Sequence, residues 1–189
     1  MNLLAEIEER GLLPIHDAGV VSVTSMIAGE PVRGSWWSHP QAQEMYRLIT
    51  EADEHEDVET VKLLGKKRTF VHRRLWLELY TVLTSKADWQ MQDVGHVAAK
   101  TLRRIESARV IRGDAIGAER KSADLLAVRL LVFQSQTHTE QGRHERVYES
   151  WAAWRKRVKL TGRKPHVAKA WMALQTAARP YAPLNLPGP

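Results

Sequence analysis

The sequence predicts a mainly α-helical protein that contains one β-hairpin. Apolar residues recur at helical spacing along most of the 189 residues, which favours amphipathic helices. One stretch differs from the rest. Residues 57–76, DVETVKLLGKKRTFVHRRLW, carry Val, Thr and Phe in two short runs around a Gly-containing turn. The chain is therefore expected to be organised around a single hairpin.

The N-terminal segments are predicted to be short helices joined by a loop. A helix over residues 3–10 is followed by a glycine, which suits a helix C-cap. Residues 20–28 are expected to form a short buried helix. Residues 29–40, GEPVRGSWWSHP, are expected to form a loop because Gly and Pro are frequent there. The next helix is expected to run from residue 40, an early position that tolerates Pro, to about residue 52.

The hairpin is predicted from runs at residues 58–64 and 69–73. Gly65 provides the backbone freedom that the turn between them requires. The turn then carries three consecutive cations, and two more follow at the end of the second run. We therefore expect a hairpin with a strongly basic tip and exit.

The rest of the chain is predicted to be helical. Helices are expected over residues 74–85, 88–112, 122–140, 145–160 and 165–178. The helix over 122–140 begins almost wholly apolar, which indicates the most buried helix of the protein. The tail RPYAPLNLPGP is Pro-rich and is expected to be extended or disordered. The sequence shows no internal repeat and no coiled-coil heptad.

The composition excludes several classes of protein. The chain is 43% hydrophobic and 26% charged, which is typical of a soluble globular protein, and it has no apolar run long enough to span a membrane. It contains no cysteine, so disulfides, thiolate catalysis and thiolate metal sites are excluded. We expect a cytoplasmic location, no cofactor and no bound metal.

The charge is unevenly distributed. Residues 1–56 hold 3 Lys and Arg against 10 Asp and Glu, whereas residues 57–189 hold 25 against 12. The isoelectric point is near 9.7, and Arg outnumbers Lys in the basic part, which suits bidentate contacts to phosphate. The pattern predicts a polyanionic partner, and nucleic acid is the commonest one.

Three motifs together resemble small uncharacterised bacterial proteins. They are GSWWSHP, KLLGKKRTFVHRRLW and HTEQGRH, and the resemblance covers about residues 20–155. It implies a bacterial origin and attaches no activity. The order of a helix, a hairpin and another helix also looks like a winged-helix domain, a likeness of architecture alone.

Together these patterns predict three regions. Residues 1–88 are expected to form a winged-helix-like module with an N-terminal helix and a Trp-Trp loop. Residues 89–178 are expected to form a basic helical region on which this module packs. Residues 179–189 form the Pro-rich tail.

The main hypothesis is a nucleic-acid-binding protein, with double-stranded DNA as the expected partner and a role in DNA repair or regulation. Basic side chains of the hairpin and of the later helices would contact phosphates, and two aromatic rings would stack. The candidate residues are Lys66, Lys67, Arg68, Arg73, Arg74, Arg103, Arg104, Arg155, Lys156, Arg157, Trp36 and Trp37. The alternatives are that the cations protect a hairpin edge and that the tryptophans fill the core.

The second hypothesis is an enzyme with a His/Glu pocket, with nucleic acid as a candidate substrate. The spacing H-x-E-x-x-x-H places Glu140 and His144 one turn apart on a continuous helix, with His138 nearby. His39 and His72 would join them from distant segments. A capped helix end with ordinary hydrogen bonds is the structural alternative. The third hypothesis is a protein-interaction module, in which the acidic N-terminus of one copy meets the basic half of another in a homodimer.

Overall fold

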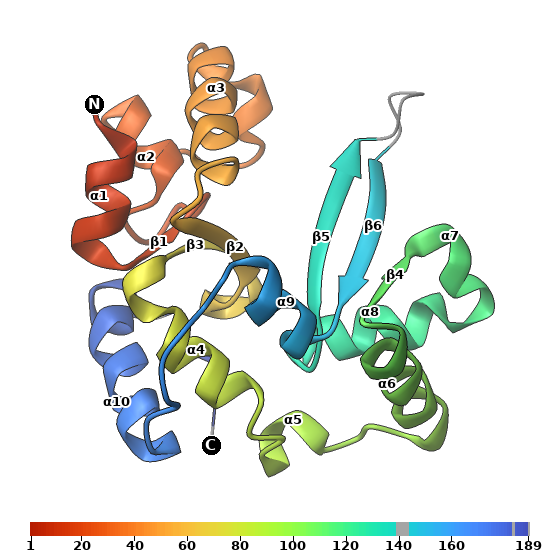
Figure 1. The fold of residues 1–189 in the computed structure, drawn as a ribbon. Helices are drawn as coiled ribbons and strands as arrows, with labels where there is room; N and C mark the ends of the chain where they lie inside the picture. Colours follow the sequence, from red (N-terminus) through yellow and green to blue (C-terminus); the bar gives the residue numbers. More distant parts are fainter. Residues whose placement is uncertain (139–143, 183, 189) are drawn as a thin grey trace. The chain divides into compact units, whose positions relative to one another are not determined.

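The protein consists of two compact units. A computed structural model describes residues 1–138, 144–182 and 184–188 (Figure 1). Unit 1 combines Met1–Leu79 with Pro165–Pro187, and unit 2 consists mainly of Tyr80–Lys164. The chain therefore leaves unit 1, builds unit 2 and then returns to unit 1.

Unit 1 contains a three-stranded antiparallel sheet with the strand order β1-β3-β2. Its elements up to the sheet's last strand are α1 (Leu3–Arg10), β1 (Leu12–Pro14), α2 (Val23–Ala28), the 3₁₀ turn η1 (Trp36–Ser38), α3 (Ala42–Asp53), β2 (Val58–Lys62) and β3 (Arg68–His72). Helix α4 (Trp76–Leu83) follows and continues into unit 2. The returning segment supplies α10 (Val167–Ala178) and η5 (Arg179–Tyr181).

Local signals in the sequence explain the ends of these elements. The Asn2 side chain accepts a hydrogen bond from the Ala5 N–H at the start of α1, and Gly11, at φ +75°, ends it. Ser22 and Ser25 cap α2 reciprocally. Three consecutive residues of the central strand, Thr69, Phe70 and Val71, are buried, so both faces of this strand are covered.

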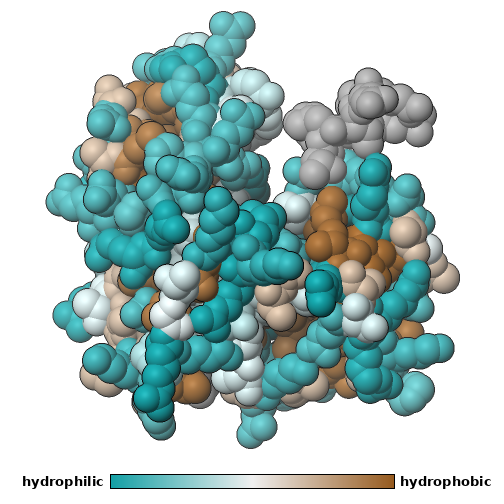
Figure 2. Space-filling model, in the orientation of Figure 1, coloured by the Kyte–Doolittle hydropathy of each residue, from teal (hydrophilic) through white to brown (hydrophobic). Residues whose placement is uncertain are grey.

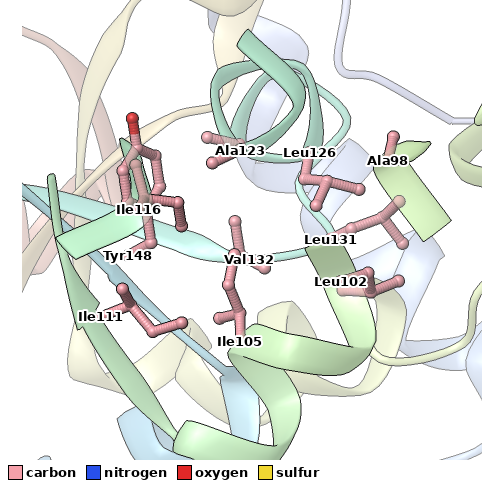
Figure 3. Close-up of a cluster of buried hydrophobic side chains, with 11 residues drawn as sticks. Ala98, Leu102, Ile105, Ile111, Ile116, Ala123, Leu126, Leu131, Val132 and Tyr148 are labelled. Carbon is pink, nitrogen blue, oxygen red and sulfur yellow. The ribbon is translucent and has the colours of Figure 1, made fainter. Parts of the chain in front are cut away.

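Unit 2 contains a second three-stranded antiparallel sheet, with the order β4-β6-β5. Its elements are α5 (Asp88–Met91), α6 (His96–Ala108), β4 (Val110–Arg112), α7 (Gly113–Ile116), the turn η4 (Gly117–Glu119), α8 (Arg120–Val128), β5 (Phe133–His138), β6 (His144–Glu149) and α9 (Trp151–Arg157). Figure 3 shows the core, in which aliphatic side chains from α6 and α8 meet Ile111 and Tyr148 of the sheet.

The two units repeat one topology. Each runs helix, strand, helix, 3₁₀ turn, helix, strand, strand, and in each sheet the third strand lies between the first and the second. A helix that begins with Trp follows the third strand in both cases, at Trp76 and at Trp151. The indole N–H of each Trp donates to a main-chain carbonyl, that of Val71 or of Leu130. The repeat lies in the order of the elements, and it does not show as a repeat in the amino-acid sequence.

The predicted fold class is therefore wrong. The prediction of one hairpin, in a winged-helix-like module packed on a helical half, fails because the described chain contains two three-stranded sheets and is mixed α/β. The main error lies in residues 122–140, predicted as one helix. Helix α8 ends at Val128, Leu130 adopts φ +57°, and the apolar residues after it lead into β5. An apolar run of this length fits a buried helix or a buried strand equally well.

Two further segments differ from the prediction. The helix expected over 88–112 is interrupted at Asp93, which has φ +61°, and ends before β4. The helix expected over 145–160 begins as β6, and α9 starts only after Ser150, whose side chain accepts the Ala153 N–H at 3.3 Å. The tail is not simply extended, because Tyr181 is fully buried and donates a hydrogen bond from its hydroxyl to the Leu12 carbonyl.

Candidate functional site

The tip of the β2–β3 hairpin is tied to other parts of unit 1. Lys67 forms an ion pair with Asp17, and Arg68 lies 3.3 Å from the carboxylate of Asp53. The Gly65 N–H donates to the Asn185 carbonyl at 2.9 Å, so the C-terminal segment reaches the turn. Lys66 is the one residue of the predicted cation trio for which the described structure shows no ion pair. The tip therefore offers less free positive charge than its sequence implies.

Asp17 is the anchor of this arrangement. Its side chain is 6% exposed and accepts hydrogen bonds from the main-chain N–H groups of Gly19 and Val20, at 2.6 and 3.2 Å. Burial raises the pKa of Asp17, but the Lys67 ammonium and these N–H groups lower it more, so the net pKa lies below its ordinary value. Asp17 is thus held as a carboxylate, and it holds Lys67.

The two arginines after the hairpin also have internal partners. Arg73 lies 2.9 Å from the carboxylate of Asp57, and its guanidinium stands 5.7 Å from the centre of the Trp76 ring. Arg74 donates to the main-chain carbonyls of Glu8 and Glu9 at 2.8 and 2.9 Å. Because these carbonyls lie in the last turn of α1, Arg74 stabilises the negative end of that helix.

These arginines line a pocket of about 530 Å³ in unit 1. One wall is the face of α1 that carries Glu8, and the others come from the residues that lead into β2 and those that follow β3. Two histidines, His55 and His72, line it as well. His72 was a predicted site residue, whereas His55 was not, because a lone His in an acidic run carries no motif.

Both pocket histidines are held in the same way. The Nδ1 atom of His55 accepts the Asp57 N–H at 3.2 Å, and Nδ1 of His72 accepts the Arg74 N–H at 3.4 Å. A neutral imidazole that accepts at Nδ1 carries its proton on Nε2. Burial lowers the pKa of His72, and the charges of Glu8 and Asp57 partly offset that effect. The pocket therefore favours the neutral form of His72, with its N–H on the Nε2 edge.

The Trp-Trp loop forms an exposed aromatic stack. The rings of Trp36 and Trp37 are 4.1 Å apart and stacked, and Tyr46 of α3 lies 5.5 Å from Trp37. Trp37 is 61% exposed and Tyr46 is 48% exposed. The two tryptophans are therefore not core residues. On the same helix as Tyr46, Arg47 is neutralised by ion pairs with Glu44 and Glu51.

The predicted cations of unit 2 fall into two groups. Arg104 donates to the Ala115 carbonyl at 2.9 Å and pairs with Glu119, Arg155 donates to two main-chain carbonyls, and Arg157 pairs with the buried Glu149. Arg103 and Lys156, in contrast, are exposed and have no ion pair in the described part of the chain.

Unit 2 holds further exposed cations without an ion pair among the described residues, and sequence reasoning did not single them out as site residues. Residues 80–164 hold 17 Lys and Arg against 9 Asp and Glu, whereas unit 1 holds 11 against 13. The excess positive charge therefore belongs to unit 2. The exposed cations of unit 2 without an ion pair among the described residues are Lys100, Arg103, Arg109, Arg120, Lys121, Lys156, Lys159, Arg163 and Lys164, the last of which donates to the Thr84 hydroxyl.

The predicted catalytic set is not assembled on a helix. His138 and His144 are Cα partners in the β5–β6 ladder of unit 2, so the two lie on neighbouring strands and not on one helix. Glu140 lies outside the described residues. His39 and His72 belong to unit 1. His39 does not line the pocket, and its Nδ1 atom accepts the Gln41 N–H before α3.

The remaining observations restrict the possible chemistry only slightly. Comparison with known protein families, curated proteins and solved structures finds no match for this chain. Within residues 1–138, 144–182 and 184–188, no three His, Asp or Glu side chains are grouped so that they could hold a metal ion. Across the same residues, each helix is too short or too polar to cross a lipid bilayer.

Proposed function

We propose that the protein binds nucleic acid through the phosphate backbone and that unit 2 supplies most of the contacts. The observation that carries this proposal is the set of exposed cations of unit 2 that have no ion pair among the described residues. Over residues 80–164 positive charges outnumber negative ones by 17 to 9. A cation that already pairs with a carboxylate must give up that partner before it can bind phosphate. An unpaired one needs only to release its counterions and water.

Helix α6 is the best-defined part of this surface. Lys100 and Arg103 are three residues apart and therefore neighbours on one face of the helix. Arg104 secures the helix to the following segment through Ala115 and Glu119. Glu119 is the last residue of the turn η4, so the exposed cations at the start of α8 come directly after it in the chain. Figure 2 shows that hydrophilic residues cover much of the visible face and that hydrophobic areas interrupt them.

The hairpin of unit 1 plays a smaller part in this proposal than the sequence suggested. Four of its five cations already bind Asp17, Asp53, Asp57 or the end of α1. Lys66 remains for phosphate contact, and the exposed ring of Trp37, which stacks on the partly buried Trp36, remains for stacking on an unpaired base. We further propose duplex DNA as the partner and the cytoplasm as the location, in keeping with the absence of cysteine.

The test is the salt dependence of binding to a short duplex. Contacts from several phosphates release several counterions, so a plot of log K against log salt should have a slope of roughly −3 to −6. Fluorescence anisotropy with a labelled 20-base-pair duplex, at salt concentrations from about 25 to 200 mM, measures this slope. Absence of binding at the lowest salt would remove the proposal, and a salt-independent affinity would exclude the phosphate mechanism.

A further inference from the structure

The unit 1 pocket has a chemistry that phosphate contacts by unit 2 do not use. Its two histidines are brought together by the sheet register, because Val58 is the Cα partner of His72 and also donates its N–H to the His55 carbonyl at 3.0 Å. Both rings line the same pocket, and both are half-buried. They are close enough that protonation of His55 would lower the pKa of His72.

Each ring has a satisfied edge and an unsatisfied one. Nδ1 accepts a main-chain N–H two residues ahead, so a neutral ring carries its proton on Nε2. Neither Nε2 atom has a hydrogen-bond partner among the described residues. The pocket is thus lined by two Nε2 N–H groups that make no hydrogen bond to the described residues and can donate to the acceptor oxygens of a ligand.

The charges of the pocket favour an anionic ligand. Asp57 is neutralised by Arg73 at 2.9 Å, whereas the guanidinium of Arg74 binds uncharged carbonyls and keeps its charge. Glu8 is the one carboxylate of the lining without an ion pair in the described structure. With both rings neutral the lining is balanced, and protonation of either ring makes it positive.

We propose that this pocket binds a small molecule through its phosphate or carboxylate group, which accepts hydrogen bonds from Nε2 of His55 and of His72. A bound anion favours the charged form of His72, so binding raises the pKa of His72 from its lowered value, at the cost of the hydrogen bond that Nδ1 accepts from the Arg74 N–H. Leu4, Ala5 and Val58 provide the apolar part of the lining against which the rest of the ligand packs. The site is independent of the cations of unit 2.

Inorganic phosphate alone is the first probe. In an NMR titration the ring signals of His55 and His72 should move and saturate together, and the pKa of His72 should rise in the presence of phosphate. Acetate serves as the carboxylate arm and shows which group the pocket prefers. Shifts that grow linearly with phosphate, or that are equal at all histidines, would overturn the proposal.

The test variants separate the Nδ1 acceptor of each histidine ring from its Nε2 donor. His55→Asn with His72→Asn keeps an acceptor near the Nδ1 position and removes the distal N–H, so phosphate binding should weaken roughly tenfold or more. The double substitution to Gln keeps a distal N–H and should lose less. His39→Asn is the matched control, because His39 also accepts an N–H two residues ahead but lies outside the pocket.

Thermal unfolding of each variant shows whether the fold is retained. Equal phosphate affinity in the Asn double variant, with its fold intact, would contradict the assignment. So would an effect of His39→Asn as large as that of the pocket variants.

Discussion

The two units share one order of elements and differ in their electrostatics. In unit 1 most of the cations near the sheet have a carboxylate or a helix end as partner, and negative charges slightly outnumber positive ones, by 13 to 11. In the described part of unit 2, exposed cations on α6, α8 and α9 have no such partner. The same topology thus carries a self-neutralised surface in one unit and a free basic surface in the other.

The comparison shows that a run of cations in a sequence is a poor measure of binding capacity. Lys66, Lys67 and Arg68 are consecutive, yet two of the three are bound within unit 1. Lys100 is a single cation and Arg103 is one of only two in a row, yet both lack an ion pair among the described residues. What decides is the position of the nearest carboxylate in the fold, and the sequence does not give it.

The largest expected effect tests whether the two cores are separate. Leu126→Ala removes a fully buried side chain from the core of unit 2 and should cost about 2–5 kcal/mol of unfolding free energy there. Hydrogen exchange should show faster exchange of amides in residues 80–164 than in residues 1–79. Equal loss of protection in both units would contradict two separate cores. Val128→Ala, on the exposed side of the same helix, is the matched control.

A smaller effect concerns the ionic anchor of unit 1. Asp17→Asn removes the charge that accepts the N–H groups of Gly19 and Val20 and pairs with Lys67, and should cost about 1–2 kcal/mol at pH 7. Because the folded pKa of Asp17 is lowered, this stability is present above its unfolded pKa of about 3.9 and is lost as pH falls through the folded value.

Urea unfolding at several pH values measures this dependence. The difference between wild type and Asp17→Asn should shrink as the pH falls below about 4. A constant difference from pH 7 to pH 2 would show that the carboxylate charge is not what stabilises the loop. Asp88→Asn, at an exposed helix start in unit 2, is the control.

Much of unit 1 could be predicted from the sequence, because its signals are local. Gly11, the β-branched runs and the Gly65 turn each specify an end or a bend within a few residues, and α1, α3 and the β2–β3 hairpin form close to the expected ranges. The third strand, β1, was missed because Leu12–Pro14 is too short to show alternation. The return of residues 165–187 to unit 1 depends on long-range contacts such as that of Tyr181 with Leu12.

Unit 2 and the pocket could be predicted far less well. The apolar run after Ser122 suits a helix or a strand, and tertiary packing decides where α8 ends and β5 begins. His55 acquires its place beside His72 only through the β2–β3 register, so no spacing along the chain could reveal the pair. Whether Arg103 has an ion pair likewise depends on which carboxylates the fold brings near it.

The most direct test of the contrast removes three cations from each unit. One variant is Lys100→Ala, Arg103→Ala and Lys156→Ala in unit 2, and the other is Lys66→Ala, Lys67→Ala and Arg68→Ala in the hairpin. Both lower the net charge equally, and thermal unfolding checks that both fold. The measured quantity is the salt slope of duplex binding. We expect the unit 2 variant to reduce the slope by roughly 2 to 3 and the hairpin variant by about 1 or less. Equal reductions, or a larger one for the hairpin, would contradict the assignment of phosphate binding to unit 2.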